Sequence, residues 1–525
     1  MKELRTYAPG ELERFKDAYL ADTGKNINTA IFDQTWNDMN MDQVFARIDT
    51  CASLAGEERL YAMLREPFSD REELLRRDAL ISSFDKDEKL SLEYRKILSG
   101  IGNDIKQPVS VSLAKLSDLQ SKSSLIHILC ALFALFSIVM IFVSPTVGLL
   151  IFLAALVVNI PVYFKRKAEI GEYIACFSHI IKACHAAESM LKVKDDEDRA
   201  YRREMRTAVR ELKTVARGSF IVTGGRGLTG GILNMALDYL RIFFHIDIIK
   251  FNSMQRRVTG HRDDILSMYK ALGEIDAFIA AADYRRSLPC WCRPEYVSDG
   301  DKEAICFSAS GLYHPLLDSP VSSDIHAENK GVLITGSNAS GKSTFLRSAA
   351  LAAILGQSIA TVSAESCTTS RFYIVSSMSV SDDIASGSSY YMAEVKALKK
   401  VIDAGETEAP VLCFVDEVLK GTNTIERIAA SSEILKSLIR DNVICFAATH
   451  DIELTEMLKE YYDNYHFEED IQDDAVKFSY RLLKGEAKSR NAIKLLKIMG
   501  YDAAITGSAE KRAKEFEETG IWKSP

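Results

Sequence analysis

A long run of uncharged residues constrains this chain more than any other feature. From Ser123 to Phe164 the sequence contains no aspartate, glutamate, lysine or arginine, and most of the run is aliphatic or aromatic. As one continuous helix, the apolar part would be about 60 Å long, roughly twice the hydrocarbon thickness of a bilayer. Two shorter helices therefore fit the run better than a single one.

A turn signal divides this run into two halves. The segment SPTVG at Ser144–Gly148 contains a proline and a glycine, which interrupt helices and favour turns. The sequence therefore predicts a transmembrane helical hairpin at 123–166, with antiparallel spans at about 125–143 and 147–164. The alternative, a helical hairpin buried inside a soluble protein, stays open at this point.

Charged residues orient the predicted hairpin. Lys115 and Lys122 precede it and Lys165–Lys167 follow it, so both flanks carry the basic residues typical of the cytoplasmic side. The N-terminus, MKELRTYAPG, is charged and lacks the apolar core of a signal peptide. We therefore expect a multi-pass protein of the cell membrane with two spans, and with both termini and the other domains in the cytoplasm. Because the spans lack aspartate, glutamate, lysine and arginine, we expect an anchor in the lipid bilayer rather than a transport pathway.

Length and composition bound the rest of the chain. The 525 residues exceed what one hydrophobic core supports, so several domains are expected. The net charge of −8, from 73 acidic and 65 basic residues, argues against a globally basic nucleic-acid coat protein. The ten cysteines lack the paired spacing of a zinc site, so we expect reduced thiols that pack as small apolar residues.

A glycine-rich segment carries the strongest chemical signal. The motif GSNASGKS at Gly336–Ser343 follows the apolar run VLIT and precedes a strong helix former, TFLRSAALAAIL. Strand, loop and helix in this order are typical of a phosphate-binding P-loop. Lys342 is expected to reach the β- and γ-phosphates, and the Ser343 hydroxyl to bind Mg²⁺. We therefore predict ATP and Mg²⁺ as cofactors, with the nucleotide held by Gly336, Ser337, Asn338, Ala339, Ser340, Gly341, Lys342, Ser343 and Thr344.

Two further apolar runs end in residues that suit phosphate chemistry. The run VLCFV is followed by Asp416 and Glu417. An aspartate at a strand end can hold Mg²⁺ through water, and the glutamate after it is placed to polarise the attacking water. We therefore predict Asp416 as a metal-binding residue beside Ser343, and Glu417 as the general base.

The third run, VICFAATH, ends at His450. A histidine at such a position often has only a structural role. In a doubly wound sheet, however, this strand would lie beside the strand that ends at Asp416, which favours a role for His450 as a sensor of the γ-phosphate.

Together, these segments resemble the ATPase domain of MutS-type proteins. The P-loop is followed by DDIASGSSYYMAE at Asp382–Glu394, then by DEVLKGTNT and ATHDIEL, in the order of that family. The segment GLYHPLL at Gly311–Leu317 resembles the entry into the domain. Upstream, Met41–Pro67 resembles the opening of the family's core, or lever, domain, and WCRPEY near Trp291 resembles its closing segment.

The resemblance implies a multidomain fold. A mostly α-helical core or lever domain carries the two-helix transmembrane hairpin and is followed by an α/β P-loop NTPase domain of the ABC-ATPase type. The expected boundaries are an N-terminal extension at 1–26, the first part of the core at 27–122, the hairpin at 123–166, the second helical part at 167–300, the ATPase domain at 301–500 and a C-terminal helical tail at 501–525.

The resemblance also implies a mechanism. ATPase domains of this family pair head to tail, so a homodimer is expected in which Ser389 of one subunit completes the catalytic site of the other. Lys342, Glu417 and His450 are the other expected catalytic residues, and Asn338 corresponds to the P-loop residue that helps to hold the nucleotide. ATP binding would then move the dimer between open and closed clamps.

Some features depart from the family pattern. Only residues 1–26 precede the expected core, so we expect the domain that reads mismatches to be absent. The segment near Val321 lacks the aromatic residue that commonly stacks on adenine, and Tyr480 is the suggested substitute. The glycine-rich run Thr223–Gly231 is interpreted as a turn between helices, because no strand precedes it as a phosphate-binding loop requires.

The sequence leaves more than one function open. The first hypothesis is a membrane-anchored, MutS-like dimeric ATPase that binds mismatched, damaged or branched DNA. The second is a membrane-tethered ATP switch that acts on a protein partner, which the net acidic charge favours. An ABC transporter fits poorly, because the chain has ASGSSYY in place of an LSGGQ-like signature and only two predicted spans.

Overall fold

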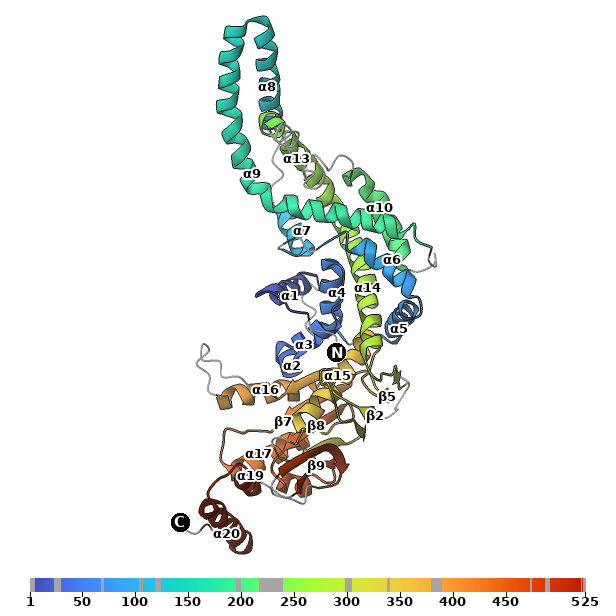
Figure 1. Cartoon of the computed structure of the whole chain (residues 1–525), viewed down its shortest axis with the longest axis vertical. Coiled ribbons are helices and arrows are strands. Elements are labelled where there is room, and N and C mark those ends of the chain that lie inside the picture. Colours follow the sequence, from blue (N-terminus) through green and yellow to red (C-terminus); the bar gives the residue numbers. More distant parts are fainter. Residues whose placement is uncertain are drawn as a thin grey trace.

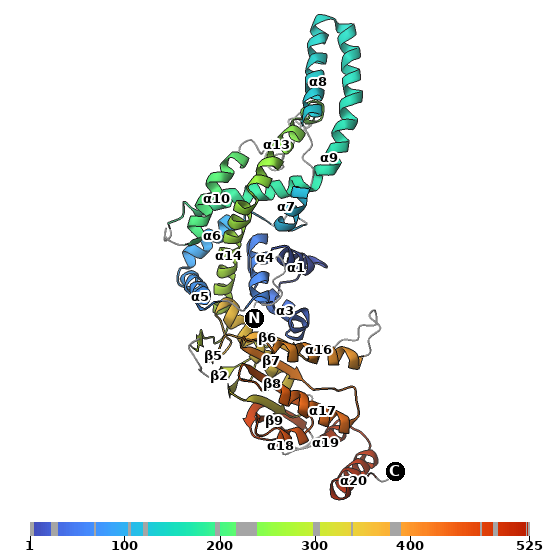
Figure 2. The ribbon, with the colours of Figure 1, turned by 180° about the vertical axis from the view of Figure 1, so that it is seen from behind.

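The computed structural model of this chain describes residues 5–22, 30–67, 70–102, 105, 107–118, 124–194, 200–216, 239–297, 305–337, 340–378, 390–472, 475–486, 492–520 and 522. Three regions follow one another along a long axis: an apolar helical hairpin at one end, a helical region in the middle and an α/β region beyond it (Figure 1). The view from behind shows the same order, with the C-terminal helix far from the hairpin (Figure 2). The fold is thus multidomain and mostly helical, with its sheets in the C-terminal half.

The hairpin consists of α8 (Leu125–Val143) and α9 (Pro145–Met190). α8 has the predicted bounds, but the prediction for the second helix was too short at both ends. Pro145 opens α9 because the first helical turn needs no backbone N–H and the φ of proline is already helical. Beyond Phe164 no strong helix breaker follows until α9 ends, so the helix continues into the helical region.

A close contact between the two helices explains the glycine of the expected turn. A Cβ atom at Gly148 would lie only 2.3 Å from the backbone nitrogen of Ile141. Gly148 already belongs to α9, and it lets the first turn of this helix pack directly against the last turns of α8. The glycine therefore serves close helix packing, while the chain reverses at Ser144.

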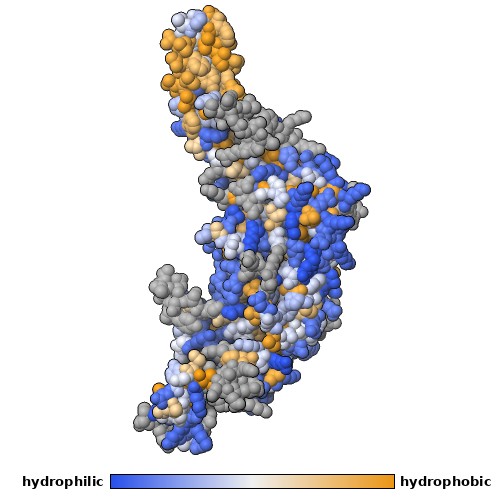
Figure 3. Space-filling view, viewed as in Figure 1, coloured by the Kyte–Doolittle hydropathy of each residue, from blue (hydrophilic) through white to orange (hydrophobic). Residues whose placement is uncertain are grey.

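The hairpin exposes apolar side chains over most of its length, which Figure 3 shows as the orange end of the molecule. Phe142 is 85% exposed and Val157 is 74% exposed. Only 22% of the apolar window of each helix is buried, in Leu125–Val143 and in Pro145–Gly171. A core helix of a soluble protein would bury most of such a window, so this exposure argues against the buried-hairpin alternative. By length and composition, both helices can cross a bilayer.

The helical region is built around one long helix, α14. Besides the second half of α9, it comprises α1 (Glu11–Asp22), α2 (Asp33–Asp38), α3 (Met41–Ile48), α4 (Leu54–Arg65), α5 (Arg71–Lys86), α6 (Glu88–Leu98), α7 (Val109–Asp118), α10 (Ala200–Ala216), α13 (Ile246–Gly260) and α14 (Arg262–Ser287). α4, α5 and α10 pack along α14, whose Leu272 and Phe278 are fully buried. The glycine-rich run Thr223–Gly231 lies outside the described residues.

A buried carboxyl joins α4 to α14. Asp276 of α14 accepts hydrogen bonds from Ser53 Oγ (2.6 Å), from the Ser53 backbone N–H (2.8 Å) and from the Ala52 backbone N–H (3.0 Å). Ser53 is also the N-cap of α4, so the carboxyl binds amide groups at the start of that helix. Burial nevertheless raises the pKa of Asp276 to about 6, because desolvation penalises the charged form more than these bonds favour it.

This raised pKa predicts a pH-dependent stability. Because the folded-state pKa exceeds the ordinary value of 3.8, Asp276 stabilises the fold fully below about pH 4, and the contribution is lost as the pH rises through about 6. We expect a loss of about 2 kcal/mol between about pH 4.5 and about pH 7. The variant D276N, whose amide does not ionise, should therefore gain melting temperature relative to the wild type across this range.

Thermal unfolding in detergent at several pH values measures this difference. D263N is the matched control, because Asp263 is an exposed aspartate of the same helix, and it should show no such gain. Identical pH profiles for D276N and the wild type would contradict the assignment.

The α/β region contains two sheets. Its strands are β1 (Pro294–Tyr296), β2 (Cys306–Leu312), β3 (Ser323–Glu328), β4 (Gly331–Thr335), β5 (Ser366–Thr369), β6 (Tyr373–Ser377), β7 (Val411–Asp416), β8 (Val443–Thr449), β9 (Tyr462–Gln472) and β10 (Ala475–Lys484). Its helices are α15 (Lys342–Ile359), α16 (Tyr390–Ala404), α17 (Thr424–Ser437), α18 (Glu453–Met457), α19 (Ala492–Ile498) and α20 (Ala503–Thr519). The larger sheet has the order β10-β9-β4-β8-β7-β6 and the smaller one β1-β5-β2-β3.

The strands of the larger sheet are parallel except for the β9–β10 pair. The small sheet begins before the expected domain boundary at residue 301, because β1 pairs with β5 from the α/β region. Proline and tyrosine in a three-residue strand give no periodic pattern, so this pairing depends on tertiary contacts that the sequence does not reveal.

Hydrogen bonds tie the helical region to α15, the helix that follows the P-loop. Arg285, at the end of α14, donates through Nη2 to the carbonyl of Ala360 (2.9 Å), just beyond α15. Arg347 of α15 donates through Nε to the carbonyl of Asp38 (2.8 Å), and the Asp38 carboxylate accepts from Ser376 Oγ (2.6 Å) in β6. Both ends of α15 are thus fixed to the helical region, which couples the two regions mechanically.

Candidate functional site

The carboxyl ends of three parallel strands meet at one edge of the larger sheet. β4 pairs with β8, with Thr335 opposite Thr449, and β8 pairs on its other side with β7, which ends at Asp416. Every residue of these three strands is buried. As predicted, the strands that precede Asp416 and His450 are neighbours. The P-loop, the acidic pair and the histidine therefore emerge side by side.

Two glycines shape the loop between β4 and α15. Gly336 has a φ of 146° and Gly341 a φ of 109°, a region that residues with a side chain rarely adopt. A Cβ atom at Gly336 would also lie 2.9 Å from Ser340 Oγ. The loop leads directly into the N-terminus of α15, where backbone N–H groups and the helix dipole favour an anion. The local backbone is therefore that of a phosphate-binding loop.

The side chain of Lys342 turns back over this loop. Its Nζ donates to the carbonyls of Gly336 (2.7 Å) and Ser337 (2.7 Å) and lies 3.4 Å from Nε2 of His450. The residue is buried. A cation held over a loop that leads into a helix N-terminus attracts a polyanion such as a triphosphate.

Ser343 and Asp416 form the part of the site that suits a metal ion. Ser343 Oγ donates to Asp416 Oδ2 at 2.5 Å. The other carboxylate oxygen of Asp416, Oδ1, is buried and has no hydrogen-bond partner within the described part of the chain. A hydroxyl and an unsatisfied carboxylate oxygen are hard ligands of the kind that Mg²⁺ prefers. These two residues thus fit the predicted Mg²⁺, whose positive charge would neutralise bound phosphates.

Glu417 occupies a constrained backbone position directly after β7. Its φ is 56°, and its backbone N–H donates to the carbonyl of Ala448 (2.9 Å) in β8. Its carboxylate contacts His450 Nε2 at 2.7 Å and Lys420 Nζ at 3.1 Å. The hydrogen bond with His450, together with Lys420 and against the effect of burial, lowers the pKa of Glu417 to about 2. The carboxylate is therefore ionised near neutral pH, and its contacts with His450 and Lys420 hold it in one orientation.

Lys420 is a site residue that the motif search missed. It holds the second oxygen of Glu417, and its backbone N–H donates to Glu394 Oε1 (3.1 Å) of α16. Glu394 is buried and is the last residue of Asp382–Glu394, the segment that contains Ser389 and resembles a conserved segment of MutS-type ATPase domains. In the sequence, only the spacing of three residues between Glu417 and Lys420 could have indicated a salt bridge. Whether the two side chains meet depends on the tight turn between them, which only the fold shows.

The remaining predicted nucleotide residues are only partly described. Asn338, Ala339 and Ser389 lie outside the described residues. Ser340 is buried and donates through Oγ to the carbonyl of Ser337 (2.8 Å). Thr344 lies in the first turn of α15 and is half-buried. The described members of the predicted set thus lie together at the P-loop.

The residue suggested for adenine stacking also lies beside the loop. A Cβ atom at Gly341 would be 3.4 Å from Cδ1 of Tyr480 and 3.8 Å from the ring of Phe467. Tyr480 has a φ of 52° and is 46% exposed, so its ring is accessible. The structure therefore brings Tyr480 to the rim of the P-loop, while its role with adenine stays a prediction.

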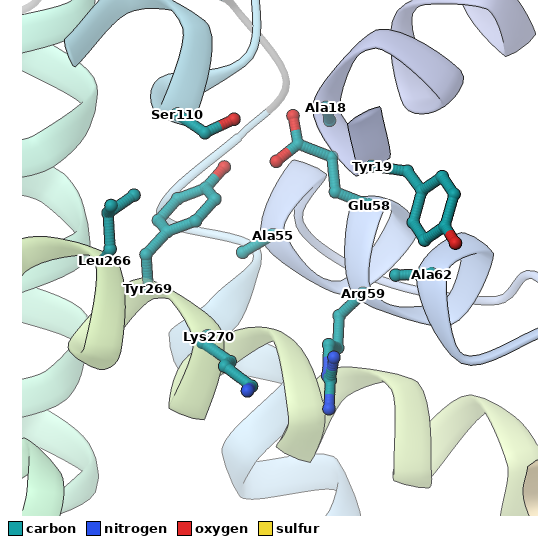
Figure 4. Close-up of a pocket in the computed structure, with 10 residues that line it drawn as sticks. All are labelled: Ala18, Tyr19, Ala55, Glu58, Arg59, Ala62, Ser110, Leu266, Tyr269 and Lys270. Atoms are coloured by element: carbon teal, nitrogen blue, oxygen red, sulfur yellow. The ribbon is translucent and has the colours of Figure 1, made fainter. Parts of the chain in front are cut away.

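A separate small pocket lies in the helical region between α1, α4, α7 and α14 (Figure 4). It encloses about 60 Å³, far less than a nucleotide site needs. Figure 4 shows the Glu58 carboxylate near Tyr269 and Ser110, with Arg59 and Lys270 on the other side. Arg59 is bound to Glu274 at 2.6 Å. This pocket is a polar junction between helices, so the P-loop edge remains the candidate functional site.

The fold and this site together define a P-loop nucleotide-binding domain with a doubly wound sheet. A loop with two glycines in the left-handed region precedes a long helix, and an aspartate, a glutamate and a histidine follow the neighbouring strands. Residues 332–517 match the family model described as MutS domain V. This match assigns that domain, rather than the whole chain, to MutS domain V.

Individual relatives agree with this assignment. The chain is 30% identical over 273 residues to the DNA mismatch repair protein MutS of Natronomonas pharaonis, across 50% of this chain and 31% of that protein. It is 28% identical over 283 residues to MutS of Lactobacillus delbrueckii subsp. bulgaricus, across 51% of this chain and 32% of that protein. It is 28% identical over 273 residues to the DNA mismatch repair protein MSH3 of Phaeosphaeria nodorum, across 49% and 24% respectively. The chain thus matches about a third or less of the length of these relatives.

Proposed function

We propose that this chain is a membrane-anchored, MutS-like dimeric ATPase that couples ATP hydrolysis to the binding of mismatched, damaged or branched DNA. The observation that carries this proposal is the meeting of the P-loop, Asp416, Glu417 and His450 at one sheet edge, within the segment that matches MutS domain V. Lys342 binds the β- and γ-phosphates, and Ser343 and Asp416 hold Mg²⁺. This site is expected to hydrolyse ATP.

The contacts of Glu417 suggest separate roles for Glu417, His450 and Lys342 in ATP hydrolysis. Glu417 accepts a proton from the attacking water, and its ionised carboxylate is ready to do so at neutral pH. His450 contacts both Glu417 (2.7 Å) and Lys342 (3.4 Å), so it bridges the general base and the phosphate-binding lysine. A γ-phosphate bound at Lys342 would change this bridge, which supports His450 as the phosphate sensor.

Membrane anchoring is supported by the exposed apolar surface of the hairpin. Eighteen-residue windows of α8 and α9 are only 22% buried. Large apolar side chains that face outward include Ile126, Leu129, Leu135, Phe136, Phe142, Leu150 and Val157. An apolar surface of this extent is stable in a bilayer but costly in water. Because basic residues lie on both flanks, the proposal puts the ends of the hairpin, the ATPase domain and both termini on the cytoplasmic side of the cell membrane.

The proposed dimer has a specific test, because Ser389 would act in the partner's site. The variants S389A and K342A should each be inactive as homodimers. In a mixed dimer, however, the intact P-loop of the S389A subunit meets the intact Ser389 of the K342A subunit. Mixing equal amounts should therefore restore about a quarter of the wild-type rate of ATP hydrolysis, since half of the dimers are mixed and each has one complete site.

Phosphate release by the mixture, compared with each variant alone, measures this recovery. Subunits must exchange, which a pulldown with differently tagged copies verifies. If mixed dimers form and no activity returns, Ser389 does not act across the dimer.

DNA binding is supported by the names of the relatives and by exposed arginines of the helical region. Arg203, Arg206 and Arg210 are exposed along α10, at positions that share one helix face. Arg256 and Arg257 are exposed on α13, which packs beside α10. Such a cluster of arginines suits the phosphate backbone of a duplex, although the whole chain is acidic.

Binding to DNA is tested with the full chain in nanodiscs of neutral lipid. Branched, mismatched and plain duplexes are titrated with and without ATP, between about 50 mM and about 200 mM salt. Phosphate contacts predict binding that weakens steeply as salt rises, and the double variant R203E/R210E should bind less tightly with a shallower salt dependence. Absence of binding at the lowest salt in every nucleotide state would overturn the DNA proposal.

The second candidate is a membrane-tethered switch that acts on a protein partner. The net charge of −8 favours it, because an acidic surface repels DNA outside any basic face. Under this alternative, the ATPase domain and the anchor keep their roles, and ATP changes the grip of the helical region on a protein. Loss of all DNA binding with intact ATP hydrolysis would favour this candidate.

A further inference from the structure

A short aromatic segment, residues 239–246, lies against the hairpin although the sequence places it far from both spans. Its first six residues are helical, His245 interrupts the helix with a φ of 52°, and α13 begins at Ile246. In Figure 1, this segment is the short green helical turn beside the lower end of α8. The segment thus connects the hairpin directly to the helical region.

Its contacts lie well inside the apolar part of the hairpin. The rings of Phe243 and Phe152 are 5.1 Å apart. Phe152 belongs to α9, about 18 Å along the helix from Phe164 at the predicted cytoplasmic end of the span. The Phe243 carbonyl accepts a hydrogen bond from Asn159 Nδ2 (2.9 Å). Asn159 lies about 8 Å along α9 from Phe164, on the side toward the middle of the span. The segment therefore lies beside the span, farther into the bilayer than the predicted cytoplasmic end of the span.

Buried hydrogen bonds surround the helix break at His245, between the short helix and α13. The Asn159 amide also donates to the carbonyl of Cys130 in α8 (3.1 Å), and the Asn159 carbonyl contacts His245 Nε2 at 3.1 Å. Nδ1 of His245 lies 2.9 Å from Nδ1 of His127. Asn159 and His245 have no exposed surface. A backbone break within lipid must be satisfied by protein groups, because no water is available there, and this network supplies partners for the carbonyls of Cys130, Phe243 and Asn159. Asn159 Oδ1 is buried without a hydrogen-bond partner in the described part of the chain.

The outer face of the segment matches the surface of the hairpin. Tyr239 is 65% exposed, Leu240 is 47% exposed and Ile246 is 41% exposed. Phe243 and Phe244 are half-buried, and so is Arg241, whose charged end would have to reach the headgroup level in a bilayer. In water, these side chains would be an isolated apolar patch beside the spans. In a bilayer, the apolar side chains among them would continue the lipid-facing surface of the hairpin.

We propose that residues 239–246 form a third membrane-embedded element, which enters the cytoplasmic leaflet beside the hairpin and contacts lipid acyl chains. This inference rests on the proposed membrane anchoring. The element does not cross the bilayer, and its chain returns at once into α13. There Asp247 accepts from Tyr163 (2.9 Å) and Lys167 (2.5 Å) of α9, which fixes the point of exit. The anchor therefore has three contacts with lipid, and one of them leads straight into the helical region.

Tryptophan quenching by brominated lipids tests the depth of the segment in the full-length chain. The probe L240W is placed at an exposed position of the segment, L153W reports the hairpin, and T259W reports the exposed surface of α13 outside it. The native Trp36, Trp291 and Trp522 lie outside the hairpin and give a common background. Each variant is reconstituted with ordinary or brominated phosphatidylcholine, and the quenched fraction is compared.

We expect L153W and L240W to be quenched at least about twofold more than T259W, with L240W responding best to bromines near the headgroup side. I246W is a second probe of the same exposed face, in case L240W does not fold. If L153W is quenched and both segment probes behave like T259W, the segment lies outside the bilayer and this inference is wrong. If L153W is not quenched either, membrane anchoring itself is wrong.

Discussion

The variant E417A is expected to hydrolyse ATP at least about 100-fold more slowly than the wild type while it still binds ATP. General-base catalysis contributes factors of about 10² to 10⁴, and Glu417 directly follows the strand end and contacts His450, which lies 3.4 Å from Lys342 of the P-loop. In the described part of the chain its carboxylate is held by His450 and Lys420, outside the P-loop, so the affinity for ATP should change little. Steady-state phosphate release and equilibrium binding of a fluorescent ATP analogue measure the two effects separately.

A matched control separates this effect from a general loss of acidic charge. E433A removes an exposed glutamate from α17, near the site in sequence but on the surface, and should retain full activity. E417Q keeps the shape of the side chain without its charge and should be as slow as E417A. If E417A turned over ATP at the wild-type rate, Glu417 would not be the general base.

The variant K342A is expected to raise the Kd for ATP by about 100-fold or more. Each hydrogen bond from the ammonium to a phosphate oxygen contributes about 1.5 to 3 kcal/mol, and every 1.4 kcal/mol changes the affinity about tenfold. In the present structure the ammonium bonds to the carbonyls of Gly336 and Ser337, so it already lies over the loop. Calorimetric titration with ATP measures the affinity, and hydrolysis should fall with it.

The control for this variant is K330A. Lys330 is exposed between β3 and β4, close to the P-loop in sequence but without a contact to it in the described structure. Its loss should leave the Kd for ATP unchanged. Wild-type affinity in K342A would contradict the assignment of the loop as the triphosphate site.

The sequence predicted the parts of the site that local pattern determines. The glycines of the P-loop, the buried runs before Asp416 and His450, and the neighbouring positions of those strands all follow from short motifs and sheet topology. The bounds of α8 were predicted for the same reason, because an uncharged apolar run between turn signals specifies one helix.

Features that depend on distant contacts were not predictable. No sequence pattern predicts Lys420 beside Glu417 in a turn with two left-handed residues, Glu417 and Leu419. The buried Asp276 is indistinguishable from a surface aspartate until α4 packs on it. No motif or pattern in the sequence sets residues 239–246 apart, and only their contacts with Phe152 and Asn159 show that they lie beside the hairpin.

The central claim is that a MutS-type ATPase is fixed in a lipid bilayer by its hairpin. Flotation of the full-length chain with phosphatidylcholine vesicles, at about 1 M salt to screen surface charge, tests it most directly. The account predicts that the protein rises with the vesicles and hydrolyses ATP there, whereas a chain with residues 125–164 replaced by a short glycine–serine linker stays at the bottom. A full-length chain that remains in the soluble fraction without detergent, and is monodisperse there, would contradict it.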